Sequence, residues 1–161
     1  MKKTILLSAF VLGALSLQAQ TALQGTNFSD NWSIGLVTGS TAKITNSKFT
    51  KSMRPAMGLE INKQVTPVLG LSIQGLGYVN TTGSKTAIDA TDLSMLGRIN
   101  LMNLFAGYEG MRRHFEIETQ MGLGWLHYYQ VGEGDRNSLS SRMGLNLNFN
   151  LGESRAWTIS M

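Results

Sequence analysis

The sequence of 161 residues contains no cysteine, which excludes disulfide scaffolds, thiolate metal sites and cysteine nucleophiles. It has only two histidines and two prolines, so histidine-rich metal sites and proline-rich linkers are excluded as well. Charged residues make up 15% of the chain, against about 25% in a typical soluble domain. The formal net charge of +4 comes from charges scattered along the chain, which leaves no basic footprint for a nucleic acid.

No hydrophobic run reaches the roughly 20 residues that a membrane-spanning helix requires. The longest run, residues 4–17, follows Lys2 and Lys3 and precedes the small residue Ala19, which is the layout of a secretory signal peptide. We therefore expect residues 1–19 to be a cleaved signal peptide and residues 20–161 to form an outer-membrane β-barrel domain. An uncleaved anchor is the alternative.

The mature chain is rich in glycine, and apolar and polar residues alternate along it with a period of two, which predicts β-strands. In the clearest segment, residues 114–130, one face carries Phe115, Ile117, Thr119, Met121, Leu123, Trp125 and Tyr129. The other face carries Glu116, Glu118, Gln120, Gly122, Gly124 and Tyr128. Residues 142–151 repeat the pattern with three asparagines on the polar face. Because asparagine is depleted in ordinary strands, we expect this face to be wet or to contact polar partners.

The strand pattern predicts a meander. Seven strands are expected to begin near residues 31, 53, 67, 93, 114, 138 and 155. Polar loops at residues 44–52, 81–92 and 131–137 alternate with shorter links, as in a transmembrane meander with longer outer loops. The predicted fold is all-β: an antiparallel up-and-down transmembrane β-barrel, with eight strands expected and about seven present in this chain.

The polar face favours a lipid-facing barrel over a soluble one. A soluble β-protein would expose many lysines and glutamates on this face, which here carries mostly Gly, Asn, Ser and Gln. The candidates for interfacial aromatic girdles near the strand ends are Trp32, Trp125, Tyr128, Tyr129 and Trp157. The charged residues expected to point inward and to pair with one another are Glu60, Arg98, Glu116, Glu118 and Arg142. Since side chains just fill an eight-stranded barrel, we expect a plugged interior.

Six short stretches, taken in their order and spacing, carry a resemblance to a known family. They are Leu17–Gln20 (LQAQ), Asp30–Gly35 (DNWSIG), Met53–Ala56 (MRPA), Thr66–Leu71 (TPVLGL), Asn103–Tyr108 (NLFAGY) and Gly122–Trp125 (GLGW). The chain resembles, over nearly its whole length, the N-terminal β-barrel of OmpA-like outer-membrane proteins of Bacteroidetes. The resemblance implies an eight-stranded barrel in the outer membrane. In many members of that family a further periplasmic domain binds peptidoglycan.

The chain departs from that family at its end. The seventh predicted strand stops at Met161, so we expect the barrel to be C-terminally incomplete, and peptidoglycan binding is assigned to none of these residues. The expected function is that of a structural outer-membrane barrel, which anchors in lipid and supports envelope integrity through a plugged, charge-paired lumen. The alternative is a binding, adhesion or small-solute porin barrel that acts through its extracellular loops.

The sequence offers no strong sign of enzymatic chemistry, and we expect no catalytic residue, no cofactor and no metal. One arrangement, His127 near Ser138, Ser140 and Ser141, is similar to that of a barrel hydrolase, but such serines are more often loop and lumen residues. The acidic stretch at residues 132–135 (GEGD) could hold calcium weakly, although a turn explains it better.

Overall fold

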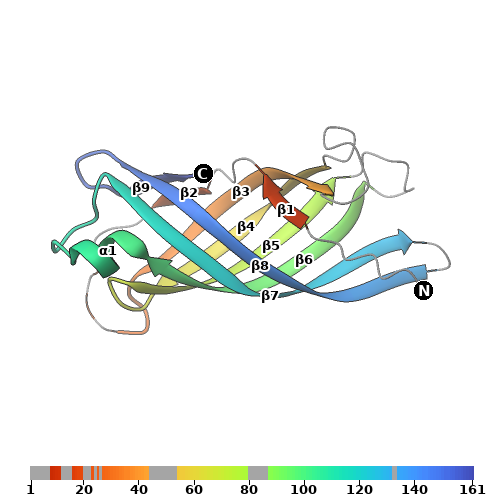
Figure 1. The fold of residues 1–161 in the computed structure, drawn as a ribbon, viewed down its shortest axis with the longest axis horizontal. Coiled ribbons are helices and arrows are strands. Elements are labelled where there is room, and N and C mark those ends of the chain that lie inside the picture. The colour runs from red at the N-terminus through yellow and green to blue at the C-terminus, as the bar shows by residue number, and fades with distance from the viewer. Residues whose placement is uncertain are drawn as a thin grey trace.

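The computed structural model describes residues 8–11, 16–19, 23, 25, 27–43, 54–79, 87–131 and 134–161. Its main feature is a set of seven antiparallel strands, each paired with its neighbour in sequence (Figure 1). They are β3 (Trp32–Lys43), β4 (Arg54–Gln64), β5 (Leu69–Val79), β6 (Ile88–Asn100), β7 (Phe115–Val131), β8 (Gly134–Leu151) and β9 (Trp157–Ser160). This up-and-down order confirms the predicted all-β meander.

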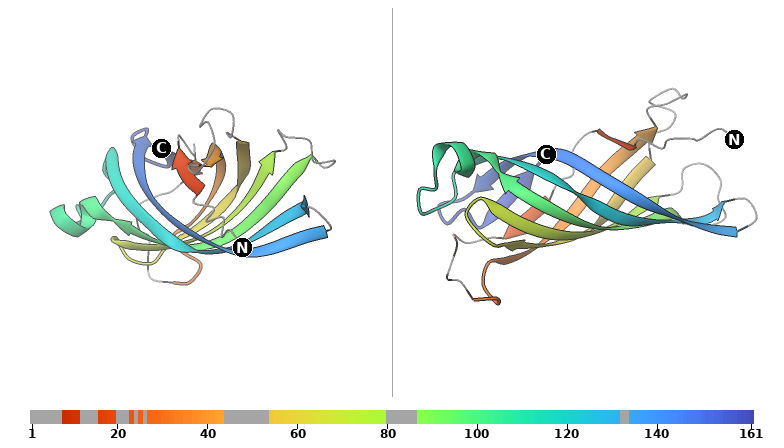
Figure 2. Two further views of the ribbon diagram at one scale, coloured as in Figure 1. Left: turned by 45° about the vertical axis from the view of Figure 1, so that its right-hand side comes forward. Right: turned by 60° about the horizontal axis from the view of Figure 1, so that its bottom comes forward.

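The seven strands curl into an open half-barrel (Figure 2). Two four-residue strands lie at its edges: β1 (Ser8–Val11) pairs with β3, and β2 (Ser16–Ala19) pairs with β9. Both lie within the residues expected to form a signal peptide, and that assignment stays a prediction. Eight strands and a membrane location stay predictions as well.

Two strands begin earlier than the sequence pattern predicts. Strand β6 begins at Ile88 instead of near residue 93, and β8 begins at Gly134 instead of near residue 138. Both segments are polar and were therefore assigned to loops. They pair with their neighbours all the same, because the inward face of this sheet accepts polar residues such as Asp92, which lies opposite Leu76 and Leu126. The predicted loop at residues 44–52, and residues 81–86 and 132–133 of the other two predicted loops, lie outside the described residues.

A short helix, α1 (Leu101–Ala106), lies between β6 and β7 where the sequence pattern predicts a longer strand and a plain link. The alternation of Ile99 and Leu101 with Arg98 and Asn100 predicts that Leu101 lies on the outward face of a strand. This prediction is wrong, because β6 ends at Asn100. The Asn100 side chain accepts a hydrogen bond from the Asn103 backbone N–H at 2.9 Å and caps the helix. Among the described residues, no helix is long and apolar enough to span a membrane.

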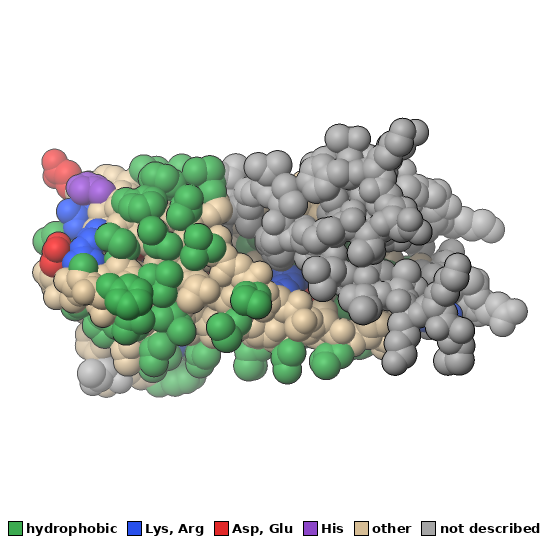
Figure 3. Space-filling view, in the orientation of Figure 1, with side chains coloured by type: hydrophobic (Ala, Val, Ile, Leu, Met, Phe, Trp, Pro, Cys, Tyr) green, Lys and Arg blue, Asp and Glu red, His purple; other side chains and the backbone are tan. Residues whose placement is uncertain are grey.

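Burial in this sheet is inverted relative to a soluble domain. Of the described residues, eighteen polar or charged side chains are buried, against five apolar ones, so the concave face is a polar core. The large apolar side chains lie on the convex face; Ile34 is 67% exposed and Leu145 is 58% exposed. Figure 3 shows hydrophobic side chains spread over this outer surface.

Two glycines allow neighbouring strands to approach closely. A Cβ atom at Gly122 would overlap the Met95 carbonyl oxygen, and one at Gly58 would overlap the Gly75 carbonyl oxygen. At Gly144, by contrast, the nearest atom is the flexible Gln120 amide nitrogen at 3.4 Å.

We predict that Gly122→Ala destabilises the fold by about 1–3 kcal/mol, because the obstructing atom is backbone and cannot move aside. Gly144→Ala, the matched control, is expected to change the free energy of unfolding by less than about 0.5 kcal/mol. Equilibrium unfolding by urea in detergent micelles measures both. Equal losses for the two variants would contradict this explanation.

Candidate functional site

The first group of buried charges has Arg98 at its centre. This arginine on β6 forms an ion pair with Glu60 on β4 at 3.4 Å and a closer one with Glu118 on β7. The Arg98 side chain is 4% exposed, and those of Glu60 and Glu118 are 7% and 3% exposed. Alternation along the three strands places these residues on the concave face. One arginine thus pairs with two buried carboxylates, which leaves this group of three side chains with a formal net charge of −1.

The second group has Asp92 at its centre. Its two carboxylate oxygens accept from Arg142 Nη2 at 2.9 Å and from Ser140 Oγ at 2.8 Å, and Ser94 donates to it as well. Asp92 lies on β6 and Arg142 on β8, so the contact crosses β7. It crosses at Gly124, where a Cβ atom would overlap the Ser94 and Ser140 hydroxyls. The glycine leaves the space that this group fills.

Gln74 on β5 joins the two groups into one network. Its amide nitrogen donates to Glu60 Oε2 at 3.0 Å, and its amide oxygen accepts from Arg142 Nη1. Arg142 Nη2 also donates to the Tyr78 hydroxyl at 3.2 Å. We call the six residues that link β4 to β8 in this way the interior network: Glu60, Gln74, Asp92, Arg98, Glu118 and Arg142. Its side chains extend over the concave face from β4 to β8.

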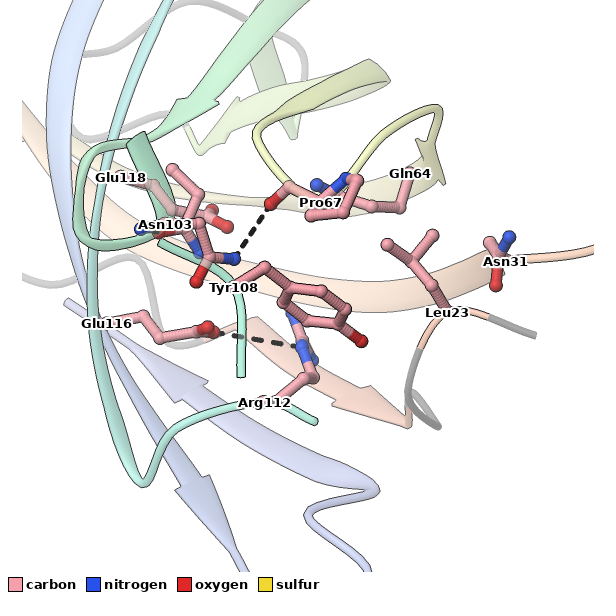
Figure 4. A pocket seen from close by; sticks show the side chains of 10 residues that line it. Leu23, Asn31, Gln64, Pro67, Asn103, Tyr108, Arg112, Glu116 and Glu118 are labelled. Atoms are coloured by element: carbon pink, nitrogen blue, oxygen red, sulfur yellow. Dashed lines mark hydrogen bonds and ion pairs between the residues drawn. The ribbon is translucent and has the colours of Figure 1, made fainter. Parts of the chain in front are cut away.

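A third group of polar residues lies at the end of the sheet near α1 (Figure 4). Arg112 Nε lies 3.8 Å from Glu116, and Asn150 donates to the same carboxylate at 3.0 Å. Burial lowers the pKa of Arg112 from its ordinary value, while Glu116 and Glu118 act in the opposite direction. Arg112, Glu116 and Glu118 line a cavity of about 30 Å³, which has room for one or two waters but not for a solute.

The predicted aromatic residues lie at both ends of the strands. Trp32 and Trp157, at the starts of β3 and β9, are 42% and 58% exposed. At the same end, Phe115 and Phe149 pair across β7 and β8 with ring centroids 5.2 Å apart. Lys63 Nζ lies 5.4 Å from the centroid of the Trp32 ring and donates to the Phe28 carbonyl at 2.9 Å, and the Trp32 Nε1–H donates to the same carbonyl at 2.7 Å.

At the opposite end of the sheet, three rings follow one another along the outer face of β7. The ring centroid of His127 lies 5.8 Å from that of Trp125 and 4.6 Å from that of Tyr129. Trp125 is 55% exposed. Tyr128 has the parity of the concave face, so it lies apart from the other predicted girdle residues.

The residues considered for hydrolysis do not come together. His127 is on the convex face, where its Nδ1 lies 2.7 Å from Asn137 Oδ1. Ser140 is on the concave face and donates to Asp92. Among the described residues, no group of three or more His, Cys, Asp or Glu side chains is placed to hold a metal ion. Gly132 and Glu133, half of the acidic stretch considered for calcium, lie outside the described residues.

Sequence reasoning missed several members of these groups, among them Asp92, Gln74 and Arg112. Asp92 was assigned to a loop, although the parity of Ser94, Leu96 and Arg98 extends to it and would have placed it inward. The alternation of Leu71 and Ile73 with Ser72 and Gln74 predicts that Gln74 lies on the polar face. It does not show which strands Gln74 links, because a sequence pattern does not say which strands face each other. Arg112 lies in the connection before β7, where no periodicity applies.

No family model matches the chain, and no curated protein and no solved structure shows a significant similarity to it.

Proposed function

We propose that this chain is a structural outer-membrane β-barrel protein of the OmpA-like kind, which anchors in lipid and supports the cell envelope. The observation that carries the proposal is the inverted burial. An ionised, hydrogen-bonded network lies inside the curled sheet, and a band of leucine, isoleucine and methionine lies outside it. In water such a band would be an unusually large exposed apolar surface, whereas in a bilayer it meets hydrocarbon.

The height of the apolar band supports a membrane. On β7 the outward aromatics Phe115 and Trp125 are ten residues apart, with Ile117, Thr119, Met121 and Leu123 between them. At about 3.3 Å per residue this is roughly 33 Å along the strand. A tilt of about 40° reduces it to roughly 25 Å, the height of the apolar band in outer-membrane barrels.

The half-barrel has two edges, along β3 and β9, and in a membrane the backbone groups of both edges would need partners. Each unpaired backbone N–H or C=O group in hydrocarbon costs several kcal/mol, so lipid-exposed sheet edges do not persist there. The edges of β3 and β9 accept antiparallel strands in this structure. We therefore propose that the inserted barrel is closed by an eighth strand between them.

The interior network supports an anchoring role in preference to a general pore. Arg142 reaches from β8 to Gln74 on β5 and to Asp92 on β6, so charged side chains cross the concave face. Moving a solute through this space would require breaking buried ion pairs. The family resemblance also implies a link to peptidoglycan through a separate domain, which is proposed for the whole protein and for none of the described residues.

Cell fractionation and conductance measurements test the proposal together. The chain, expressed with its leader in a Gram-negative host, is expected to sediment with outer membranes and to resist extraction by alkaline carbonate. Reconstituted into planar bilayers, it is expected to show no steady large conductance. Recovery in the soluble fraction would overturn the membrane assignment. A steady conductance would instead favour the porin alternative.

A further inference from the structure

The helix α1 presents two large apolar side chains away from the sheet. Leu104 is 52% exposed and Phe105 is 82% exposed. The buried residue of the same helix is Asn103, which is 7% exposed. The helix carries no charged residue. Figures 1 and 2 show α1 at the end of the sheet where β7 begins, to the side of the curled strands.

The orientation of α1 is held by hydrogen bonds on its buried side. Asn103 Nδ2 donates to the Pro67 carbonyl in the β4–β5 turn at 2.8 Å, in addition to the cap that Asn100 provides. Arg113 closes the following loop, since its Nη2 donates to the Gly107 carbonyl at 2.8 Å and contacts Glu109 at 3.1 Å. The helix therefore cannot rotate to bury Phe105 without breaking these contacts.

The position of this apolar pair coincides with one end of the proposed lipid band. Strand β7, which follows α1, begins at the outward aromatic Phe115, and Trp32 and Trp157 lie at the same end of the sheet. Met111, in the loop between α1 and β7, is 54% exposed. The apolar surface of α1 thus continues the girdle, at the depth where amphipathic segments lie among lipid headgroups.

We propose that α1 is an interfacial anchor, which inserts Leu104 and Phe105 at the boundary between headgroups and acyl chains of one leaflet. The inference rests on the proposed membrane function. Because α1 is uncharged, its attachment depends on apolar burial and is independent of anionic lipid and of salt. The occupant of this surface is therefore lipid of any headgroup charge, and not an acidic or basic protein partner.

Spin labels measure the depth of α1 directly, because the chain has no native cysteine. Three single variants of the full chain are labelled in phosphatidylcholine vesicles: Phe105→Cys, Leu145→Cys in the middle of the apolar band, and Ser154→Cys on the exposed turn before β9. Accessibility to a water-soluble nickel chelate is expected to be several-fold lower at position 105 than at position 154, and lowest at position 145.

The three labels separate failure of this inference from failure of the proposed function. Equal accessibility at positions 105 and 154, with position 145 protected, would overturn the anchor and leave the membrane barrel standing. Water access at position 145 would overturn both.

A fourth label, Ala106→Cys, excludes insertion driven by the label itself. It is expected to become more accessible to the chelate when Phe105→Ser is added. An unchanged accessibility in that background would overturn the anchoring role of Phe105.

Discussion

Replacing Arg98 with methionine is expected to lower the free energy of unfolding by about 3–5 kcal/mol, because the change leaves two buried carboxylates without their counter-charge. Glu60 and Glu118 are each in contact with Arg98, and all three side chains are buried. Equilibrium unfolding by urea in detergent micelles or lipid vesicles measures the loss.

Two controls show whether the loss comes from unpaired charge. The triple variant Glu60→Gln, Arg98→Met, Glu118→Gln removes all three charges and is expected to recover most of the stability. Arg136→Met makes the same chemical change at an exposed position and is expected to stay within about 0.5 kcal/mol of the parent. If the triple variant were no more stable than R98M, packing and not charge would explain the effect.

An arginine in the middle of the apolar band is expected to cost about 2–4 kcal/mol, if the convex face meets lipid. Leu145 is the natural position, because it is 58% exposed and lies on β8 between the levels of Phe149 and Leu139. Leu145→Arg is therefore expected to reduce insertion into vesicles and the stability of the inserted protein. Recovery of membrane-inserted protein and unfolding by urea measure the two effects.

Leu151→Arg is the matched control on the same strand. Leu151 is 45% exposed and lies beyond Phe149, at the end of the band, so the same change is expected to cost only about 0–1 kcal/mol. In a soluble protein both leucines would face water, and both arginines would be nearly neutral. Equal and small effects at the two positions would therefore contradict the membrane proposal.

The inward position of the main charged residues could be predicted because strands have a period of exactly two residues. Glu60 lies between Leu59 and Ile61, Arg98 precedes Ile99 and Glu118 follows Ile117. The structure places all three charged side chains on the concave face. The errors arose where that period is absent or is hidden by polar composition. Strand β6 begins at Ile88 inside a segment that looks like a loop, and α1 interrupts the pattern after Asn100.

Alternation along the strands does not predict which charged and polar side chains contact one another across the concave face. Arg142 is directly opposite Gly122 in the β7–β8 register, yet its ion pair is with Asp92 on β6. This contact requires the space above Gly124 and the curl of three consecutive strands. Gln74 joins the two charged groups for the same reason, since β5 and β8 are brought toward each other by the curvature of the sheet.

The sequence by itself determined the seven main strands, their antiparallel order and the face on which most of their side chains lie. These features depend on local alternation and on short connections between consecutive strands, both of which are visible in one dimension. Only the tertiary structure decided which charges meet, because a charge pair between non-neighbouring strands depends on register and curvature. It also decided the orientation of α1, since the hydrogen bond from Asn103 to Pro67 joins residues 36 positions apart in sequence.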